Sequence, residues 1–275
     1  MRKPDLVCIG AQKAGTSWFH EVFGSRSDVW VPPFKELHFF DHKFIPANRR
    51  WTKWHVAKGV KSAKARYHSN PEAYDPDFLE YLRMIETPPM FNGRWYRSIF
   101  AKSGAQQICM DVTPEYCTIP DEGVEFVKRF LPHSQFLFIV RDPLERVISQ
   151  LRMNLSRKKL TPSSHCEWIE AVSDPELLVR GDYIQYIPRW RQHFSDKRLL
   201  IMPFAKIKTS PYEFLSEVER FVGLPKSIYL EDPSKQIHKT SRIKIPEFAI
   251  DYLREKIQPQ HDFLAECLGR EYLRG

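Results

Sequence analysis

The chain contains 275 residues, enough for one large domain or two small ones with a substantial buried core. Hydrophobic residues make up 42% of the chain, which excludes a largely disordered protein. The sequence contains no run of 18 consecutive apolar residues, so no membrane span is predicted. The formal net charge of +8 favours an anionic ligand, but it does not choose between nucleic acid, nucleotide and polyanionic glycan.

The cysteines and the N-terminus bear on the cellular compartment. The five cysteines are scattered, odd in number and without a C-x-x-C motif, so we expect reduced thiols and no disulfides or zinc site. The first residues, MRKPDLVCIGAQ, hold only a short hydrophobic run, so no signal peptide is expected. These features predict a cytoplasmic protein.

Apolar runs and helical patterns alternate along the chain. Runs of the kind that form buried strands lie at 6–9, 107–110, 135–140 and 199–202. Helical patterns lie at 121–131, 143–155, 182–194, 211–222 and 246–257, the last two beginning with proline. Continuous apolar strands that alternate with helices predict a parallel sheet covered on both faces. With no repeat or linker, residues 1–275 are expected to form a single α/β domain.

The sequence GAQKAGTS, residues 10–17, follows the first strand-like run and precedes a plausible helix. Such a strand–loop–helix unit directs backbone N–H groups and the positive helix end at an anion. The Walker A pattern places lysine directly after the second glycine, whereas here the lysine is Lys13 and the glycine is followed by Thr16 and Ser17. A lysine at this earlier position would lie near the bridging oxygen of a single phosphate. The hydroxyls of Thr16 and Ser17 would then bond to that phosphate directly, without a metal. A glycine-bearing turn with an incidental lysine is the alternative.

Residues 31–41, VPPFKELHFFD, set Glu36 and His38 between aromatic residues. On a strand, the alternating Glu36, His38 and Phe40 would share one face, with Leu37 and Phe39 on the other. A carboxylate flanked by apolar groups can have a raised pKa, which suits a general base. Two surface charges beside a core strand are the commoner interpretation of an isolated Glu and His.

The stretch from residue 42 to residue 71 contains no Asp or Glu but eight Lys or Arg, with Trp51, Trp54 and Tyr67 interleaved. Cations combined with aromatic rings are suited to binding a polyanion or a sugar. A solvated, loosely ordered insertion is an equally open alternative.

Residues 136–150, FLFIVRDPLERVISQ, end a predicted strand in Arg141 and carry Ser149 about two turns into the next helix. Ligands of α/β sheets bind at the carboxyl ends of strands, so both side chains could converge on one phosphate. Arg-Asp-Pro alone often marks only a strand-to-helix turn. Asp111 is the one acidic residue that could serve as a Walker B aspartate, which disfavours an ATP kinase.

Taken together, these motifs resemble those of the sulfotransferases that use 3′-phosphoadenosine 5′-phosphosulfate (PAPS), in particular the glycosaminoglycan (heparan sulfate) sulfotransferase branch and its bacterial relatives. The resemblance rests on GAQKAGTS, PPFKELHFFD, MDVTPEY at 110–116 and the Arg141–Ser149 block, and continues more weakly through 181–194 and 219–225. It implies a P-loop NTPase-like fold and PAPS as co-substrate, with no metal required. Residues 43–93 lie largely outside it and are interpreted as a family-variable insertion on the acceptor side.

The resemblance implies two groups of donor-binding residues. The 5′-phosphosulfate would be held by loop residues Lys13, Ala14, Gly15, Thr16 and Ser17. The 3′-phosphate would be held by Arg141 and Ser149, and a late basic loop with Lys239 and Arg242 would close over the nucleotide.

The resemblance also implies how catalysis would proceed. Glu36 would take the proton of the acceptor hydroxyl or amine, and Lys13 would stabilise charge on the bridging oxygen during in-line sulfuryl transfer. His38 and Asp41 match neighbouring polar positions, and His38 is the next candidate for the base. Several glycosaminoglycan enzymes have Glu-Lys-Thr-Pro where this chain has Asp-Val-Thr-Pro at 111–114, so Lys35 or the basic insertion could replace the missing lysine.

The acceptor stays open at this point. Carbohydrate, lipid, amine, phenol and small metabolite are all compatible, and the basic stretch suggests an anionic or carbohydrate partner, with no nucleic acid expected. Two other functions compete: a P-loop nucleotide or small-molecule kinase, which predicts Mg²⁺-dependent nucleotide binding, and a basic nucleic-acid-binding protein, which predicts steeply salt-dependent affinity.

Overall fold

The structure is a computed structural model, and it describes residues 2–69, 75–226, 229, 232–234 and 243–273. At its centre is a five-stranded parallel sheet with the strand order β2-β3-β1-β4-β5. The strands are β1 (Leu6–Gly10), β2 (Val29–Trp30), β3 (Ile108–Val112), β4 (Gln135–Val140) and β5 (Leu199–Pro203). Four of them confirm the predicted apolar runs to within two residues, whereas the short edge strand β2 has no counterpart among the predictions.

Helices follow or connect these strands. In the first half of the chain they are α1 (Thr16–Gly24), α2 (Phe39–Phe44), α3 (Arg49–His68), α4 (Pro76–Glu86), α5 (Gly93–Ser98) and α6 (Asp121–Phe130). In the second half they are α7 (Pro143–Lys158), α8 (His165–Val172), α9 (Glu176–Val179), α10 (Tyr183–His193), α11 (Ala205–Thr209), α12 (Pro211–Val222) and α13 (Glu247–Cys267). Short 3₁₀ helices are η1 (Pro46–Asn48), η3 (Pro114–Thr118) and η4 (Arg270–Leu273). All five predicted helices form, and the last ends ten residues later than its pattern indicated.

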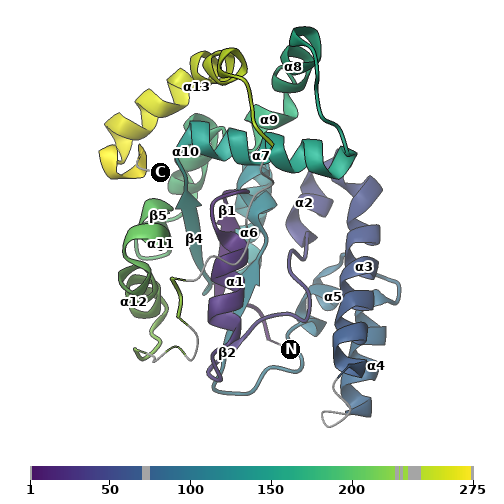
Figure 1. Ribbon diagram of the computed structural model, residues 1–275. Coiled ribbons are helices and arrows are strands. Elements are labelled where there is room, and N and C mark those ends of the chain that lie inside the picture. The colour runs from purple at the N-terminus through teal and green to yellow at the C-terminus, as the bar shows by residue number, and fades with distance from the viewer. Residues whose placement is uncertain (1, 70–74, 227–228, 230–231, 235–242, 274–275) are drawn as a thin grey trace.

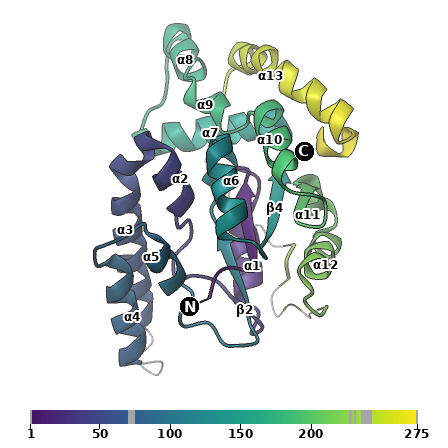
Figure 2. The ribbon, with the colours of Figure 1, turned by 180° about the vertical axis from the view of Figure 1, so that it is seen from behind.

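Helices cover both faces of the sheet, which confirms the predicted α/β architecture. α1 lies in front of the sheet in Figure 1 and packs on α12, where the rings of Trp18 and Phe214 meet edge-on with centroids 5.7 Å apart. α6 and α10 lie on the opposite face, which is turned forward in Figure 2. There Trp190 of α10 packs on Phe136 of β4.

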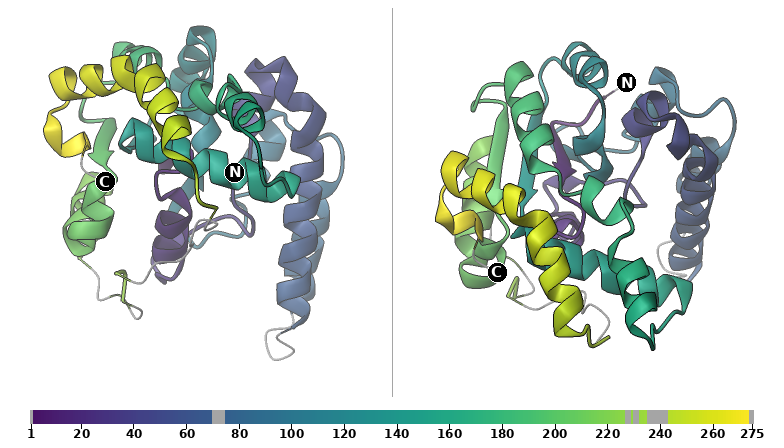
Figure 3. Two further views of the ribbon diagram at one scale, coloured as in Figure 1. Left: turned by 45° about the horizontal axis from the view of Figure 1, so that its top comes forward. Right: turned by 90° about the horizontal axis from the view of Figure 1, so that it is seen from above.

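The carboxyl ends of the parallel strands meet at one edge of the sheet, and α7 crosses this edge (Figures 1 and 3). The loops after β1, β3 and β4 therefore converge beneath α7, where ligands of such sheets bind. α7 is anchored from its outer side by a separate apolar cluster with α8, α9 and α13, which includes Leu151, Trp168 and Leu253. This packing fixes the helix that carries Ser149.

α3 and α4 pack side by side along one flank of the molecule (Figure 1). α3 is strongly basic, yet it forms a 20-residue helix because Thr52, Val56, Val60 and Ala63 make one buried stripe. The alternative of a loosely ordered insertion is therefore wrong for residues 49–68. Among the residues that the structure describes, no helix is both long and apolar enough to cross a membrane.

The strand expected to present Glu36, His38 and Phe40 on one face does not form, because the segment after β2 is irregular and α2 begins at Phe39. Glu36 and His38 both have left-handed backbone conformations, with φ of 69° and 52°. They cannot alternate along an extended strand. The segment is tied to the sheet by Thr113, whose Oγ1 accepts a hydrogen bond from the Leu37 N–H at 2.9 Å.

Candidate active site

The loop after β1 wraps around the N-terminus of α1. Gly15 precedes this helix with φ of 81°, and a Cβ there would lie 2.9 Å from side-chain atoms of Phe204 and Ile207, so both the backbone and the space require glycine. α1 begins at Thr16, and no described side chain caps it. Its first N–H groups and the positive end of its dipole are thus available to an anion.

Arg141 and Ser149 approach this loop from β4 and α7. The Arg141 Nη1 donates to the Lys13 carbonyl oxygen at 2.9 Å, and its Nε and Nη2 donate to Glu145 Oε2 at 3.2 and 2.9 Å. The guanidinium also lies 4.6 Å from the centre of the Phe204 ring. Ser149 is buried on the side of α7 that faces the loop. The two side chains therefore lie on one site, as the interval between them suggests.

A cavity of about 680 Å³, here called the loop cavity, lies between this loop, α7 and α11. It brings together most of the residues expected to bind the donor: Lys13, Gly15, Thr16, Ser17, Arg141 and Ser149. Ala14 is fully buried and does not line the cavity. Lys239 and Arg242 lie outside the described residues, so their expected role stays a prediction.

Positive charge is concentrated at the loop cavity. Burial lowers the pKa of Lys13, and the neighbouring cations of Arg157, Arg141 and Lys35 lower it further. Arg157 lines the cavity from α7, eight residues after Ser149. A cavity with several cations of this kind favours a ligand with more than one negative charge.

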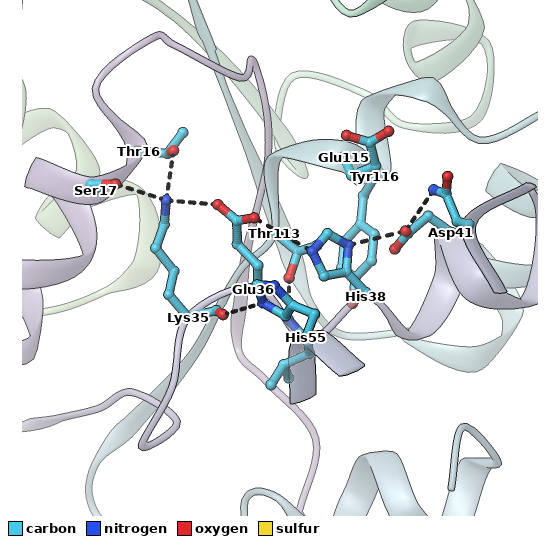
Figure 4. A network of polar contacts seen from close by, with 12 residues as sticks. Thr16, Ser17, Lys35, Glu36, His38, Asp41, His55, Thr113, Glu115 and Tyr116 are labelled. Carbon is cyan, nitrogen blue, oxygen red and sulfur yellow. Dashed lines mark hydrogen bonds and ion pairs between the residues drawn. The ribbon is translucent and has the colours of Figure 1, made fainter. Parts of the chain in front are cut away.

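Glu36 lines the loop cavity and lies between two basic side chains, Lys35 and His38 (Figure 4). The Lys35 Nζ lies 3.1 Å from Glu36 Oε1, and the His38 Nε2 lies 3.4 Å from Oε2. The same Lys35 Nζ donates to Thr16 Oγ1 at 3.1 Å and to Ser17 Oγ at 3.0 Å. Lys35 thus connects the anion-binding loop directly to Glu36.

His38 is held on its far side by a second carboxylate. Its Nδ1 lies 3.0 Å from Asp41 Oδ2, which also accepts a hydrogen bond from Asn48 at 2.9 Å. Burial alone would lower the pKa of His38, but the carboxylates of Asp41 and Glu36 raise it to about 10. The buried imidazole is therefore protonated at neutral pH and places a positive charge against Glu36.

The expectation of a raised pKa for Glu36 is wrong. Burial acts in that direction, but the Lys35 ammonium and the contacts with His38 and His55 outweigh it and hold the pKa of Glu36 well below its usual range. The side chain is 25% exposed and faces cations instead of apolar groups. Glu36 is consequently ionised at neutral pH.

Asp111 lies inside the core behind the site. It accepts hydrogen bonds from the hydroxyls of Thr113, Tyr96 and Tyr116 at 2.6, 2.8 and 3.1 Å, and burial raises its pKa to about 6 against these bonds. The Thr113 hydroxyl also accepts a bond from the backbone that follows Glu36. Asp111 therefore supports the position of Glu36 through Thr113. Both oxygens of Asp111 are engaged in these hydrogen bonds and are not directed at a nucleotide.

A second cavity of about 1240 Å³, here called the outer groove, opens on the other side of Glu36. Its α3 wall is aromatic and basic, with Trp51, Trp54, His55, Lys58 and Arg66. Trp54 is 63% exposed, and the Lys58 Nζ lies 5.0 Å from the centre of its ring. The residues that line both cavities are Gln12, Ser17, Lys35, Glu36, Met153 and Arg157. Glu36 therefore lies at the junction of two binding spaces.

Glu36, His38 and His55 bring one ligand atom each within 4.8 Å of one another, a spacing that could hold a metal ion. The Lys35 ammonium and the protonated His38 already compensate the Glu36 carboxylate. Glu36 and His38 are therefore already charge-paired by described side chains. That the reaction requires no metal stays a prediction.

Two site residues, His55 and Arg157, do not follow from sequence reasoning. A signal for Arg157 exists, because Ser149, Met153 and Arg157 are spaced four residues apart and share one face of α7. His55 carries no such signal. It reaches the site only because α3 packs beside the 31–38 segment, where its Nε2 lies 3.1 Å from the Lys35 carbonyl oxygen.

A parallel α/β sheet with a lysine-bearing anion loop after β1, an arginine after β4 and a carboxylate between two cavities defines a P-loop-like group-transfer protein. Residues 4–227 match the family model described as "Sulfotransferase family", and the chain belongs to this family. The resemblance inferred from the motifs is thereby confirmed.

Curated relatives include two heparan sulfate enzymes. Heparan sulfate glucosamine 3-O-sulfotransferase 5 of Mus musculus is 24% identical over 234 residues, which cover 82% of this chain and 55% of the relative. Heparan sulfate glucosamine 3-O-sulfotransferase 6 of Homo sapiens is 26% identical over 168 residues, which cover 54% of this chain and 49% of the relative. The chain spans about half the length of the curated relatives it matches.

Solved structures support the same fold. A sulfotransferase from Alicyclobacillus acidocaldarius superimposes with a TM-score of 0.62 at 18% identity, over 95% of this chain and 92% of that one. A sulfotransferase domain from the curacin biosynthetic pathway gives 0.52 at 13% identity, over 94% and 98% of the two chains. At these identities the likeness concerns the fold alone, and it agrees with the predicted P-loop NTPase-like class.

Proposed function

We propose that this protein transfers the sulfuryl group of PAPS to a hydroxyl or amine of an acceptor by in-line displacement, with Glu36 as the general base. The observation that carries the proposal is the position of Glu36 at the junction of the loop cavity and the outer groove. An acceptor in the outer groove and a donor in the loop cavity would meet at this carboxylate.

The loop cavity supports the binding of PAPS. The α1 N-terminus with Lys13, Thr16 and Ser17 would hold the 5′-phosphosulfate. Arg141 and Ser149 would hold the 3′-phosphate. Of the five guanidinium N–H groups of Arg141, the contacts among described residues use three and leave one on each terminal nitrogen, which suits two hydrogen bonds to a phosphate.

The chemistry requires one bond to form as another breaks. The acceptor oxygen or nitrogen bonds to sulfur, the bond from sulfur to the bridging oxygen breaks, and adenosine 3′,5′-bisphosphate leaves. The acceptor proton goes to Glu36, and Lys13 stabilises the charge that develops on the bridging oxygen. His38, fixed by Asp41, holds the Glu36 carboxylate in position.

The outer groove supports an anionic acceptor with ring-shaped units, for which carbohydrate is the proposed class. Lys58, Arg66 and Arg157 line it, and the exposed face of Trp54 offers a surface on which a sugar ring can stack. The heparan sulfate relatives carry carbohydrate in their names, which agrees with this proposal. We propose that residues 43–93, through α3, set the choice of acceptor.

We further propose a cytoplasmic location, with the reaction taking place in a reducing compartment. The support comes from the cysteines, which are all free thiols: Cys8, Cys109, Cys117, Cys166 and Cys267.

Calorimetry tests the donor side of the proposal. Adenosine 3′,5′-bisphosphate is expected to bind in the presence of EDTA, and at least about tenfold more tightly than adenosine 5′-monophosphate, since two added charge-assisted bonds are made. Binding of ATP only with Mg²⁺ would favour the kinase alternative. DNA or RNA binding that falls steeply with salt and is unaffected by loss of Lys13 would favour a nucleic-acid-binding protein.

A further inference from the structure

The ammonium of Lys35 has an unusual set of partners. Its three N–H donors meet three oxygens at nearly equal distances: Thr16 Oγ1 at 3.1 Å, Ser17 Oγ at 3.0 Å and Glu36 Oε1 at 3.1 Å. Two of these oxygens belong to the first turn of α1, and the third belongs to the proposed base (Figure 4). Lys35 therefore spans the path between the donor and the acceptor.

The position at α1 is electrostatically poised for an anion. A helix N-terminus carries partial positive charge, so an ammonium held there is repelled unless a negative group is close by. In the structure Glu36 supplies that negative group, and the Lys35 ammonium in turn lowers the pKa of Glu36 and makes it a weaker base. The sulfuryl oxygens of a donor whose 5′-phosphate is held by this loop would compete with Glu36 for the same ammonium.

We propose that Lys35 is a catalytic residue that bonds to the sulfuryl oxygens when the donor is bound, and that its transfer from Glu36 to the donor strengthens Glu36 as a base. This inference rests on the proposed function. It makes base strength depend on donor occupancy, so that the acceptor is deprotonated only when a sulfuryl group is in place.

The other charged groups around Glu36 leave room for such a change. His38 remains paired with Glu36 Oε2 at 3.4 Å, so the carboxylate keeps its orientation after Lys35 departs. Burial lowers the pKa of His55 and lowers that of His20 to about 4, so both rings are neutral at neutral pH. Lys13 faces the loop cavity and would be drawn to the bridging oxygen. Lys35 is thus the mobile cation whose position governs the basicity of Glu36.

Calorimetry with two ligands tests the first part of the inference. The ligands are adenosine 3′,5′-bisphosphate, which lacks the sulfuryl group, and a non-transferable PAPS analogue with a methylene bridge to the sulfonate. Lys35→Met is expected to weaken binding of the analogue by about 10- to 100-fold and that of the bisphosphate by less than about threefold, because only the analogue presents the oxygens that Lys35 bonds. Bisphosphate binding also reports that the variant is folded.

Lys64→Met is the matched control. Lys64 forms a similarly half-buried pair with Glu86 on the flank of α3 and lines neither cavity, so this change should leave both affinities unaltered. Equal losses for the two ligands in Lys35→Met, or no loss for the analogue, would overturn the role of Lys35 while leaving the proposed function intact. Failure of both ligands to bind the unaltered protein would instead overturn the proposed function and the inference with it.

Proton uptake on binding tests the second part. Calorimetry near pH 5 in buffers of different ionisation enthalpy gives the number of protons taken up with each ligand. Subtracting the number measured for Glu36→Gln from that of the unaltered protein gives the proton uptake due to Glu36. This uptake is expected to be larger for the sulfonate analogue than for the bisphosphate, by about 0.2 proton or more per site. Equal uptake for the two ligands would show that the sulfuryl group does not draw Lys35 away from Glu36.

Discussion

Replacement of Arg141 by methionine should remove the discrimination between ligands with and without a 3′-phosphate. The guanidinium is anchored by the Lys13 carbonyl oxygen, Glu145 and the Phe204 ring, and Arg141 lines the loop cavity with two N–H groups that these contacts do not use. Hydrogen bonds to a charged group contribute about 1.5–3 kcal/mol, so the affinity for adenosine 3′,5′-bisphosphate should fall by about 10- to 140-fold.

The same change should leave the fold intact. The lost pair with Glu145 is partly exposed, with side-chain exposures of 16% and 35%, and such pairs contribute about 0.2–1 kcal/mol. Lys208, 3.4 Å from the same carboxylate, still compensates Glu145. Urea denaturation should therefore show only a small loss in the free energy of unfolding.

The assay is calorimetry with adenosine 3′,5′-bisphosphate and adenosine 5′-monophosphate on the unaltered protein, Arg141→Met and Arg129→Met. Arg129 forms an exposed i,i+4 pair with Glu125 and serves as the matched control. Arg141→Met should lose affinity for the bisphosphate alone, and Arg129→Met for neither ligand. Equal losses for the two nucleotides in Arg141→Met would refute the assignment of Arg141 to the 3′-phosphate.

Three further predictions follow from the site. Glu36→Gln should reduce turnover, measured by steady-state kinetics, by about 10²- to 10⁴-fold, and should lower donor affinity, measured by calorimetry, by less than about threefold. Near-normal turnover would show that Glu36 is not the base. Because the pKa of His38 is raised from its unfolded value near 6.5 to about 10, its contribution to stability is complete below pH 6.5 and is lost as pH rises through 10. The free energy of unfolding should thus fall between pH 6.5 and 9.5 by more in the unaltered protein than in His38→Gln, and parallel pH profiles would contradict the ion pairs of His38. Gly15→Ala should destabilise the protein more than Gly223→Ala. Both positions have positive φ, which costs an alanine about 1–2 kcal/mol at either site, but only at Gly15 does the new Cβ also meet atoms 2.9 Å away. Equal losses in urea denaturation would mean that the contacts with Phe204 and Ile207 relax at no cost.

The sheet and the anion loop were predictable from local sequence because their signals are local. The central strands β1 and β4 are nearly continuous apolar runs, and burial on both faces of a parallel sheet demands such runs. Lys13 and Gly15 lie two positions apart in the eight-residue string GAQKAGTS, so their joint placement at a helix N-terminus needs no long-range contact.

The segment that carries Glu36 could not be predicted in the same way. Its alternation of apolar and polar residues fits a strand, but its conformation is set by contacts distant in sequence, such as the bond from the Leu37 N–H to Thr113. The pKa of Glu36 likewise depends on His55, which α3 brings in from 19 residues further along the chain.

The order of α3 also depends on tertiary packing. Its buried stripe includes the polar Thr52 and the small Ala63, so the hydrophobic signal is weak. The helix comes so close to the 31–38 segment that a Cβ at Gly59 would lie 2.8 Å from Phe34. Such close packing is a property of the folded chain and leaves little trace in composition.

Transfer of label from ³⁵S-labelled PAPS tests the central claim most directly. The unaltered protein and Glu36→Gln would be incubated with labelled donor, EDTA and a panel of acidic oligosaccharides, lipids and small phenols and amines, and products would be identified by mass spectrometry. We predict label on at least one acceptor, with Glu36→Gln slower by about 10²-fold or more although it binds adenosine 3′,5′-bisphosphate normally. Transfer at equal rates by both proteins, or no transfer together with no binding of the bisphosphate, would contradict a sulfuryl transfer centred on Glu36.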